Sequence, residues 1–332
     1  MWTRQKNSKH ILIELLEPVI FIDETHETSP VVRGTVIINL DNCVIQNLSI
    51  QFDGLKKTQW KKDSKVQQLV SKDLQIPATT GTTKFPFEMP LPSGIPESVK
   101  SSDIQVEYTM SVRLLYKKMN IPTVQHEEST KAIVLARLPE RQYHPLATQK
   151  QFADWCKYRI SIDKKSVALG SKLGIKFEIS PLLQGFRLKQ IFVQVLERRT
   201  VHDDTNQSCH FIYPAKNSHL NLPSKSINQG WQATCDYQLP DDKLSHSTME
   251  YQDFKISHVV LVSLIVSDRH TTRTISYQMD VDLLNSQVSQ LDDRDYLKLP
   301  AYNCVMTPQE LQKLHSLGLY TCPPSYEDSI AV

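Results

Sequence analysis

One short motif in the sequence has residues whose types and spacing suit specific recognition, Pro323-Pro324-Ser325-Tyr326. Two consecutive prolines favour the polyproline II conformation, so the segment loses little conformational entropy when it docks. The tyrosine adds an amphipathic ring for a groove lined by aromatic side chains, and this combination is typical of WW-domain ligands. With 18 prolines and 12 tyrosines in the chain, the motif arises by chance only about 0.04 times. We therefore predict a WW-binding site at these four residues.

A second segment, Leu299-Pro300-Ala301-Tyr302, has a weaker form of the same pattern. Leu299, Pro300 and Tyr302 are the residues of an L-P-x-Y motif, which makes them candidates for a second WW contact. The structural alternative is a proline that ends a strand, followed by a packed tyrosine. The residues alone leave both interpretations open.

The stretch 56–65 is the main basic segment, with five lysines and one tryptophan. It follows a strand that we expect to end at Asp53-Gly54. Such a segment could meet anionic lipid or the acidic tail of a cargo protein, and the simpler alternative is a solvated loop. The lysines that we single out for this contact are Lys56, Lys57, Lys61 and Lys62.

Enzyme motifs are missing from the sequence. There is no H-E-x-x-H, no G-x-S-x-G and no phosphate-binding glycine loop, and the chain has only nine glycines. The segment 202–210 contains two His, two Asp and one Cys, but their spacing matches no metal site and favours a polar loop. We expect a protein that is not an enzyme, with no catalytic residue, no metal and no cofactor.

Charge and hydropathy exclude further classes of protein. The 38 basic and 36 acidic residues nearly balance, which argues against a nucleic-acid partner. The longest aliphatic-rich stretch, 259–266, is far shorter than the about 20 residues of a membrane-spanning helix. None of the six cysteines form a C-x-x-C pair, and reduced thiols are the simpler interpretation. We expect a cytoplasmic protein.

The elements that must position these candidates are β-strands. Apolar and polar residues alternate with period two over 104–116, 173–179 and 275–283, and shorter stretches repeat the pattern. Many alternating segments separated by turn residues are typical of antiparallel β-sandwiches. We predict an all-β fold of two immunoglobulin-like antiparallel β-sandwich domains in tandem, followed by a short tail with one marginal helix over 307–317, where a capping box precedes three leucines at helical spacing.

Changes in composition divide the chain into four parts. Between the two predicted sandwiches, a segment with Pro139 and Pro145 loses the alternation and resembles a linker. After about residue 286 the strand pattern ends. The predicted parts are an N-terminal sandwich, 9–138, a linker, 139–152, a C-terminal sandwich, 153–286, and a flexible tail, 287–332.

Three blocks of residues, taken in order, resemble the α-arrestins, or arrestin-related trafficking adaptors. The first runs from 10–15 through Val32-Arg33-Gly34-Thr35-Val36 to Phe52-Asp53-Gly54. The second is the F-P-F…L-P…P-x-S block at 85–98, with the strand from 104 and Tyr108 in the family's tyrosine position. The third, 158–197, is similar to the start of an arrestin C-domain. The resemblance covers about 9–285, and the two tail motifs complete it.

The resemblance implies an arrestin-like fold and an adaptor function. Such proteins recruit WW-domain HECT ubiquitin ligases to membrane cargo, a transporter or receptor, and promote its ubiquitylation and endocytosis or sorting. The partners implied here are a ligase, membrane-protein cargo and a peripheral contact with anionic membrane at the plasma membrane or endosomes. Ala301 stands where a second proline is common in the family. The alternative is an arrestin-like scaffold subunit of an endosomal sorting coat, without ligase recruitment.

Overall fold

The structure is a computed structural model, and it describes most of the chain between residues 8 and 290. The described ranges are 8–17, 19–22, 29–40, 42–60, 63–79, 83–119, 123–138, 146–202, 208–214, 218–220, 230–240 and 244–290. The predicted helix at 307–317 and nearly all of the predicted tail lie outside these residues.

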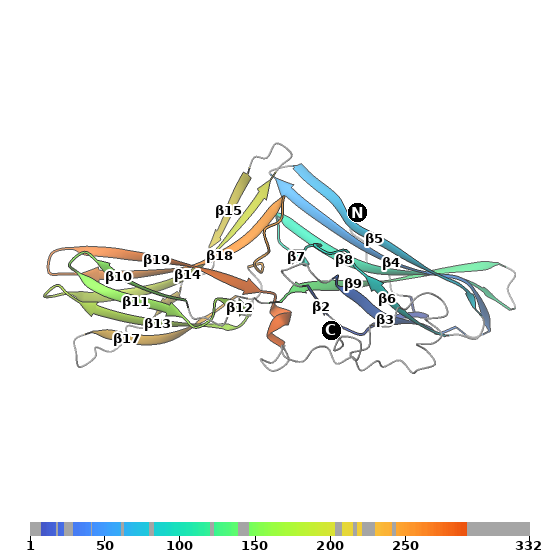
Figure 1. The fold of residues 1–332 in the computed structure, drawn as a ribbon, viewed down its shortest axis with the longest axis horizontal. Helices are drawn as coiled ribbons and strands as arrows, with labels where there is room; N and C mark the ends of the chain where they lie inside the picture. The colour runs from blue at the N-terminus through green and yellow to red at the C-terminus, as the bar shows by residue number, and fades with distance from the viewer. Residues whose placement is uncertain are drawn as a thin grey trace, which may run out of the picture.

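The described residues form an all-β protein of two sandwiches that lie end to end along the long axis (Figure 1). This confirms the predicted fold class. The strands of the N-terminal half are β1 (Ile11–Leu15), β2 (Val19–Ile22), β3 (Val31–Ile38), β4 (Cys43–Trp60), β5 (Asp63–Thr79), β6 (Lys84–Pro90), β7 (Val99–Lys100), β8 (Ile104–Lys118) and β9 (Val124–Arg137). Those of the C-terminal half are β10 (Leu146–Phe152), β11 (Cys156–Ile162), β12 (Ser166–Ala168), β13 (Lys172–Pro181), β14 (Arg187–His202), β15 (Ser208–Pro214), β16 (Ser218–Leu220), β17 (Trp231–Gln238), β18 (Phe254–Ser267) and β19 (Thr272–Leu284).

Each half pairs a small sheet with a larger one. In the N-terminal half a three-stranded sheet, β1-β3-β6, faces a six-stranded sheet with the order β2-β9-β8-β4-β5 and β7 beside β8. In the C-terminal half the sheets are β10-β11-β13-β17 and β12-β19-β18-β14-β15, with β16 beside β14. Among the described strands, all pairs are antiparallel except β2–β9 and β12–β19. This strand order suits the alternating sequence, because one face of each sheet meets the core and the other meets solvent.

The inward positions of the alternating strands fill one hydrophobic core in each half. In β8, for example, Ile104, Val106, Tyr108, Met110 and Val112 are buried, as the period-two pattern predicted. The core of the C-terminal half draws on β11, β13, β14, β18 and β19 in the same way. Burial of these side chains is the main force that holds each pair of sheets together.

Two apolar joints connect the halves. Val201, Phe254 and Ile256, from the ends of β14 and β18, pack into the core of the N-terminal half. A small separate cluster joins the end of β9 to β12, to the end of β19 and to the short 3-10 helix η1 (Ser286–Gln290), through Ala136, Ala168, Leu284 and Val288. The first residues of the predicted tail are therefore packed, because Val288 is only 1% exposed.

Two expectations about strand bounds need correction. The strand expected to end at Asp53-Gly54 continues to Trp60 and pairs with β5, so the described residues of the basic stretch, 56–60 and 63–65, lie in paired strands. Gly54 permits this continuation, because the ring of Tyr108 occupies the space beside it. The predicted linker, 139–152, contains a strand, since Leu146–Phe152 form β10 and pair with β11. The domain boundaries themselves stay a prediction.

We predict that Gly54→Ala lowers the free energy of unfolding by about 1–3 kcal/mol, the usual cost of overpacking. A Cβ at this position would lie 2.5 Å from Cε1 of Tyr108 and 2.8 Å from Cγ1 of Val70. Urea denaturation measures the change. As a control, Gln68→Ala on the exposed face of β5 should change stability by no more than about 0.5 kcal/mol. Equal stability of Gly54→Ala and the wild type would contradict the close packing.

Candidate functional site

Most of the binding residues predicted from sequence lie outside the described residues. These are Pro323, Pro324, Ser325 and Tyr326, the second motif with Leu299, Pro300 and Tyr302, and the lysines Lys61 and Lys62. Lys57 is described, and its half-buried side chain lies on the outer face of β4.

Lys56 was wrongly grouped with the surface lysines. It is only 7% exposed, and its Nζ forms an ion pair with Asp253 and lies 6.0 Å from the centre of the Phe254 ring. The physical reason is the continuation of β4, because inward and outward positions alternate along a strand and Lys56 follows the inward residues Phe52 and Gly54. This lysine holds the two halves together and does not belong to the surface that meets a partner.

A buried ionic cluster lies where the two halves meet. Nη1 of Arg199, on β14, donates to Asp103 of the N-terminal half at 2.6 Å, and its Nε pairs with Glu197 on its own strand. Glu197 also lies 3.2 Å from Nε2 of His258 and accepts the N–H of Ser245 at 2.6 Å. Burial tends to raise the pKa of Glu197, but His258, Arg199 and this N–H together hold it below the ordinary value. The carboxylate is therefore ionised and fully satisfied.

A second buried carboxylate, Glu97, connects the same two halves. It precedes β7 in the N-terminal half and is fully buried. Its oxygens accept the hydroxyl of Tyr251 and the N–H of Met249 at 3.2 Å, both from the C-terminal half. Burial raises the pKa of Glu97. The hydrogen bonds from Tyr251 and Met249 act in the opposite direction but only partly offset the effect of burial. Glu97 thus anchors the segment that precedes β18.

That segment, 244–251, is irregular and mostly buried, and we call it the strap. Ser247 Oγ accepts the N–H of Leu283 at 2.9 Å and lies 2.8 Å from Nδ1 of His258. The hydroxyl of Thr248 accepts the N–H of Ile256 at 2.9 Å. Because its side chains and backbone contact β18, β19 and the N-terminal half, the strap connects both apolar joints through hydrogen bonds.

His246 of the strap lies among charges from both halves. Arg137, from the end of β9, pairs with Asp282 of β19. His246 is 7% exposed, and its Nε2 makes no hydrogen bond among the described residues. Burial, with Arg137 and His258 nearby, lowers the pKa of His246 from 6.5 to about 4, although Asp282 and Glu197 act in the opposite direction. His246 is therefore neutral at physiological pH.

The sequence contained a signal for this cluster that the sequence analysis missed. In β14 the inward residues Ile191, Val193 and Val195 are followed at the same period by Glu197 and Arg199. Charged residues at inward positions of a strand must find partners, because unpaired buried charges are very costly. The partners could not be inferred from the sequence, since Asp103 and Ser245 are far away along the chain.

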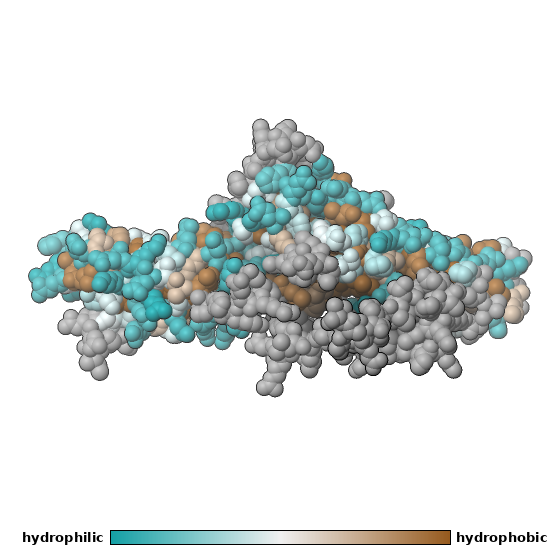
Figure 2. Space-filling view, in the orientation of Figure 1, coloured by the Kyte–Doolittle hydropathy of each residue, from teal (hydrophilic) through white to brown (hydrophobic). Residues whose placement is uncertain are grey.

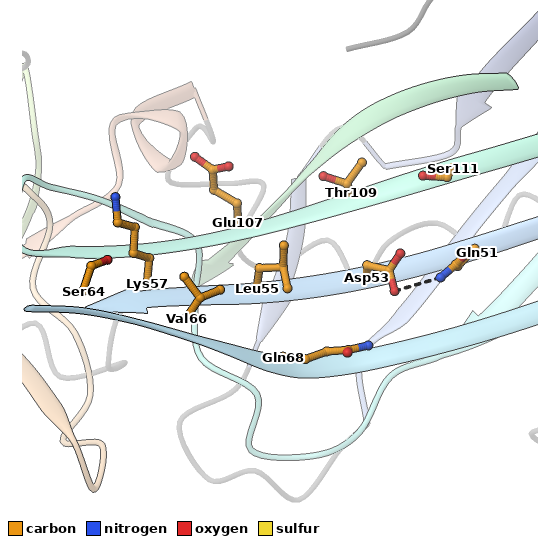
Figure 3. A pocket seen from close by; sticks show the side chains of 10 residues that line it. All are labelled: Gln51, Asp53, Leu55, Lys57, Ser64, Val66, Gln68, Glu107, Thr109 and Ser111. Carbon is orange, nitrogen blue, oxygen red and sulfur yellow. Dashed lines mark hydrogen bonds between the residues drawn. The ribbon is translucent and has the colours of Figure 1, made fainter. Parts of the chain in front are cut away.

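A hollow of about 500 Å³ lies on the outer face of β4, β5 and β8, away from the core (Figure 3). Asp53, Leu55 and Lys57 of β4 line it together with Val66 of β5 and Glu107 of β8. Hydrophilic residues cover much of the visible surface of the protein, and hydrophobic residues gather in places over the N-terminal half (Figure 2). The hollow thus combines carboxylates, one ammonium group and exposed aliphatic side chains.

Within the part of the chain that the structure describes, no group of three or more His, Cys, Asp or Glu side chains could hold a metal ion. Most side chains of the 202–210 segment lie outside that part. Among the described residues, no helix has both the length and the hydropathy that crossing a bilayer requires.

Comparison with known proteins agrees with this architecture. Residues 153–288 match the family model of the arrestin (or S-antigen) C-terminal domain. The chain is 26% identical over 136 residues to the HECT-type ubiquitin ligase-interacting protein apyA of Emericella nidulans. This match covers 40% of this chain and 35% of the relative. It is 29% identical over 122 residues to the probable HECT-type ubiquitin ligase-interacting protein creD of Aspergillus clavatus, which covers 35% of this chain and 19% of that relative.

Residues 153–288 are therefore similar to an arrestin C-terminal domain, and the tandem all-β sandwiches fit this similarity. The resemblance to the α-arrestins is confirmed by the C-terminal domain match together with the ligase-interacting relatives. The chain spans only about a third or a fifth of the length of the curated relatives that it matches.

We predict that Arg199→Met lowers the free energy of unfolding by about 3–5 kcal/mol, because it removes the guanidinium that pairs with two carboxylates at the joint, Glu197 and Asp103. Arg198→Met is the matched control, since Arg198 is exposed on the same strand, and it should cost no more than about 0.5 kcal/mol. Chemical denaturation compares the two. Arg199→Lys keeps the charge without the forked guanidinium and should fall between them. Equal effects of Arg198→Met and Arg199→Met would refute the ionic joint.

The low pKa of His246 predicts a loss of stability in acid. The unfolded chain binds a proton near pH 6.5 and the folded chain only near pH 4, so stability falls as the pH drops through this window. At pH 5 this single group should cost about 2 kcal/mol relative to pH 7.5. His246→Gln should remove that part of the pH dependence, whereas His270→Gln, in the exposed β18–β19 turn, should not. Denaturation at both pH values tests this, and parallel pH profiles for wild type and His246→Gln would contradict it.

Proposed function

We propose that this protein is a non-enzymatic adaptor that recruits a WW-domain HECT ubiquitin ligase to membrane-protein cargo and promotes its ubiquitylation and endocytosis or sorting. The observation that carries the proposal is the Pro323-Pro324-Ser325-Tyr326 motif on an arrestin-like chain. The relatives' names support it, since both are described as HECT-type ubiquitin ligase-interacting proteins. The motif supplies the chemistry that a WW domain recognises, and the sandwiches supply a separate surface for cargo.

The mechanism is proximity. The motif holds the ligase while the sandwiches hold the cargo, so cargo lysines experience a raised effective concentration of the ubiquitin-transfer site. The buried ionic cluster and the apolar joints support this role, because they fix the two sandwiches relative to one another. A fixed body presents cargo in a defined orientation, which lets the adaptor choose which lysines face the ligase.

A second contact between adaptor and ligase would strengthen a weak first one. Leu299, Pro300 and Tyr302 precede the main motif, with 21 residues between Tyr302 and Pro324. If a ligase carries tandem WW domains, both motifs engage it, and avidity exceeds the affinity of either contact alone. We propose that the adaptor works at the plasma membrane or endosomes, with Lys57, Lys61 and Lys62 as candidates for a contact with anionic lipid.

We predict that a Lys298–Val332 peptide binds isolated WW domains saturably and that Tyr326→Ala weakens binding about tenfold or more, because the ring fills the aromatic groove. Fluorescence polarisation measures the affinity. Tyr320→Ala is the matched control, since this tyrosine lies in the same peptide outside both motifs. Tyr302→Ala should weaken binding to tandem WW domains but not to a single domain held by the main motif.

Two results would contradict the proposal. Absence of binding by the wild-type peptide would remove the ligase contact and favour the coat-scaffold alternative, which requires no WW recognition. Equal losses from Tyr320→Ala and Tyr326→Ala would show that the peptide binds WW domains without using the motif.

A further inference from the structure

The hollow on the outer face of β4, β5 and β8 has no role in holding the fold together. Its side chains come from outward positions of the three strands, opposite to the core residues (Figure 3). Asp53, Leu55 and Lys57 follow one another at every second position of β4. Cross-strand pairing places Glu107 opposite Leu55, and Val66 opposite Lys57. The hollow therefore presents its side chains in short rows that run across the strands.

The carboxylates of the hollow have unused capacity to bind a cation. Glu107 forms no hydrogen bond or ion pair with the described residues, and burial raises its pKa although Lys100 acts in the opposite direction. Asp53 accepts a hydrogen bond from Nε2 of Gln51 at 3.1 Å. A carboxylate offers about four lone-pair sites, so both groups can accept more donors. The charge of a cationic partner beside Glu107 would favour its ionised form.

Aliphatic surface lies beside these carboxylates. Leu55 is 37% exposed and Val66 is 58% exposed, which is unusual for large apolar side chains on a sheet that has a filled core. Covering them removes apolar area from water and favours binding. A purely apolar partner would bury Asp53 and Glu107 without compensation, and an acidic partner would meet two like charges. The lining thus favours a partner that carries both positive charge and apolar side chains.

We infer that this hollow binds an extended, basic peptide segment in which the side chains along one face are alternately basic (lysine or arginine) and aliphatic, so that basic and aliphatic residues lie two positions apart in its sequence. In an extended chain every second side chain points to the same face, about 7 Å apart, which matches the spacing of the outward positions of β4. Basic side chains pair with Asp53 and Glu107, and aliphatic ones cover Leu55 and Val66.

This inference rests on the proposed adaptor function, because it names the part of the cargo that the sandwich recognises. Cytoplasmic segments next to membrane-spanning helices are enriched in lysine and arginine. Such a segment carries positive charge that complements the Asp53 and Glu107 carboxylates, which outnumber the one ammonium group of the hollow, that of Lys57.

The test uses the full chain and three labelled synthetic peptides of roughly 12 residues, the length of an extended binding segment. In all three, every second residue is a serine spacer; the residues between the spacers alternate lysine with valine in the first peptide, glutamate with valine in the second and serine with valine in the third. Fluorescence polarisation at low and moderate salt should show saturable binding of the lysine peptide, at least about tenfold tighter than either other peptide and weaker at higher salt.

The double variant D53N/E107Q keeps the shape of the hollow and removes its charge. It should weaken binding of the lysine peptide about tenfold, whereas Glu178→Gln, an exposed carboxylate on β13, should change it less than about twofold. Val66→Ser tests the apolar part separately and should weaken binding of all valine peptides. Thermal unfolding of each variant confirms that it is folded.

Three results would overturn the inference. The first is equal affinity for the lysine and serine peptides, which would assign the hollow to a neutral partner. The second is tighter binding of the glutamate peptide, and the third is unchanged binding of the lysine peptide to D53N/E107Q. WW-domain binding, the proposed ligase contact, is measured separately on the same proteins. D53N/E107Q should retain WW binding and Tyr326→Ala should retain peptide binding, so failure of one function leaves the other result intact.

Discussion

The arrangement of the whole molecule depends on one constraint, that a charge buried between two sandwiches needs a partner. Glu197 and Arg199 occupy inward positions at the end of β14, where the core of the C-terminal half has ended and the N-terminal half begins. Asp103 from the opposite half completes the cluster, and Glu97 and Lys56 form comparable contacts with the strap and Asp253. Such groups add little net stability compared with apolar packing, but a wrong docking angle leaves them unpaired. The ionic cluster therefore specifies how the two sandwiches are oriented, and the apolar joints stabilise the contact between them.

The sequence predicted the fold where alternation is regular. The strands at 104–116, 173–179 and 275–283 correspond to β8, β13 and β19, because each has one buried and one solvated face. Prediction was wrong where alternation was interrupted by charge or glycine. The basic stretch suggested a loop because lysines are usually exposed, yet the period of two continues through Gly54, Lys56 and Lys57. The strand pattern was a better guide to Lys56 than its residue type.

The candidate sites divide in a similar way. The motif at Pro323–Tyr326 can be proposed from sequence alone, since a linear motif needs no neighbours that are distant along the chain. The ionic cluster and the hollow are not predictable, because they depend on pairing register. Glu107 reaches the side of Leu55 only because β4 and β8 pair in one register, and Ser245 reaches Glu197 only because the strap crosses between the halves. Residue types show which groups need partners, and only the fold shows which partners they have.

The packing of Phe254 and Ile256 into the N-terminal core has a consequence for biosynthesis. The ribosome makes β1 to β9 well before β18, so the first sandwich emerges without three of its core residues and with Glu97 and Asp103 unpaired. Until the strap and β18 are made, that sandwich is an incomplete intermediate with exposed apolar surface, which attracts chaperones and quality control. Completion of translation is therefore the step that finishes the cores of both sandwiches together.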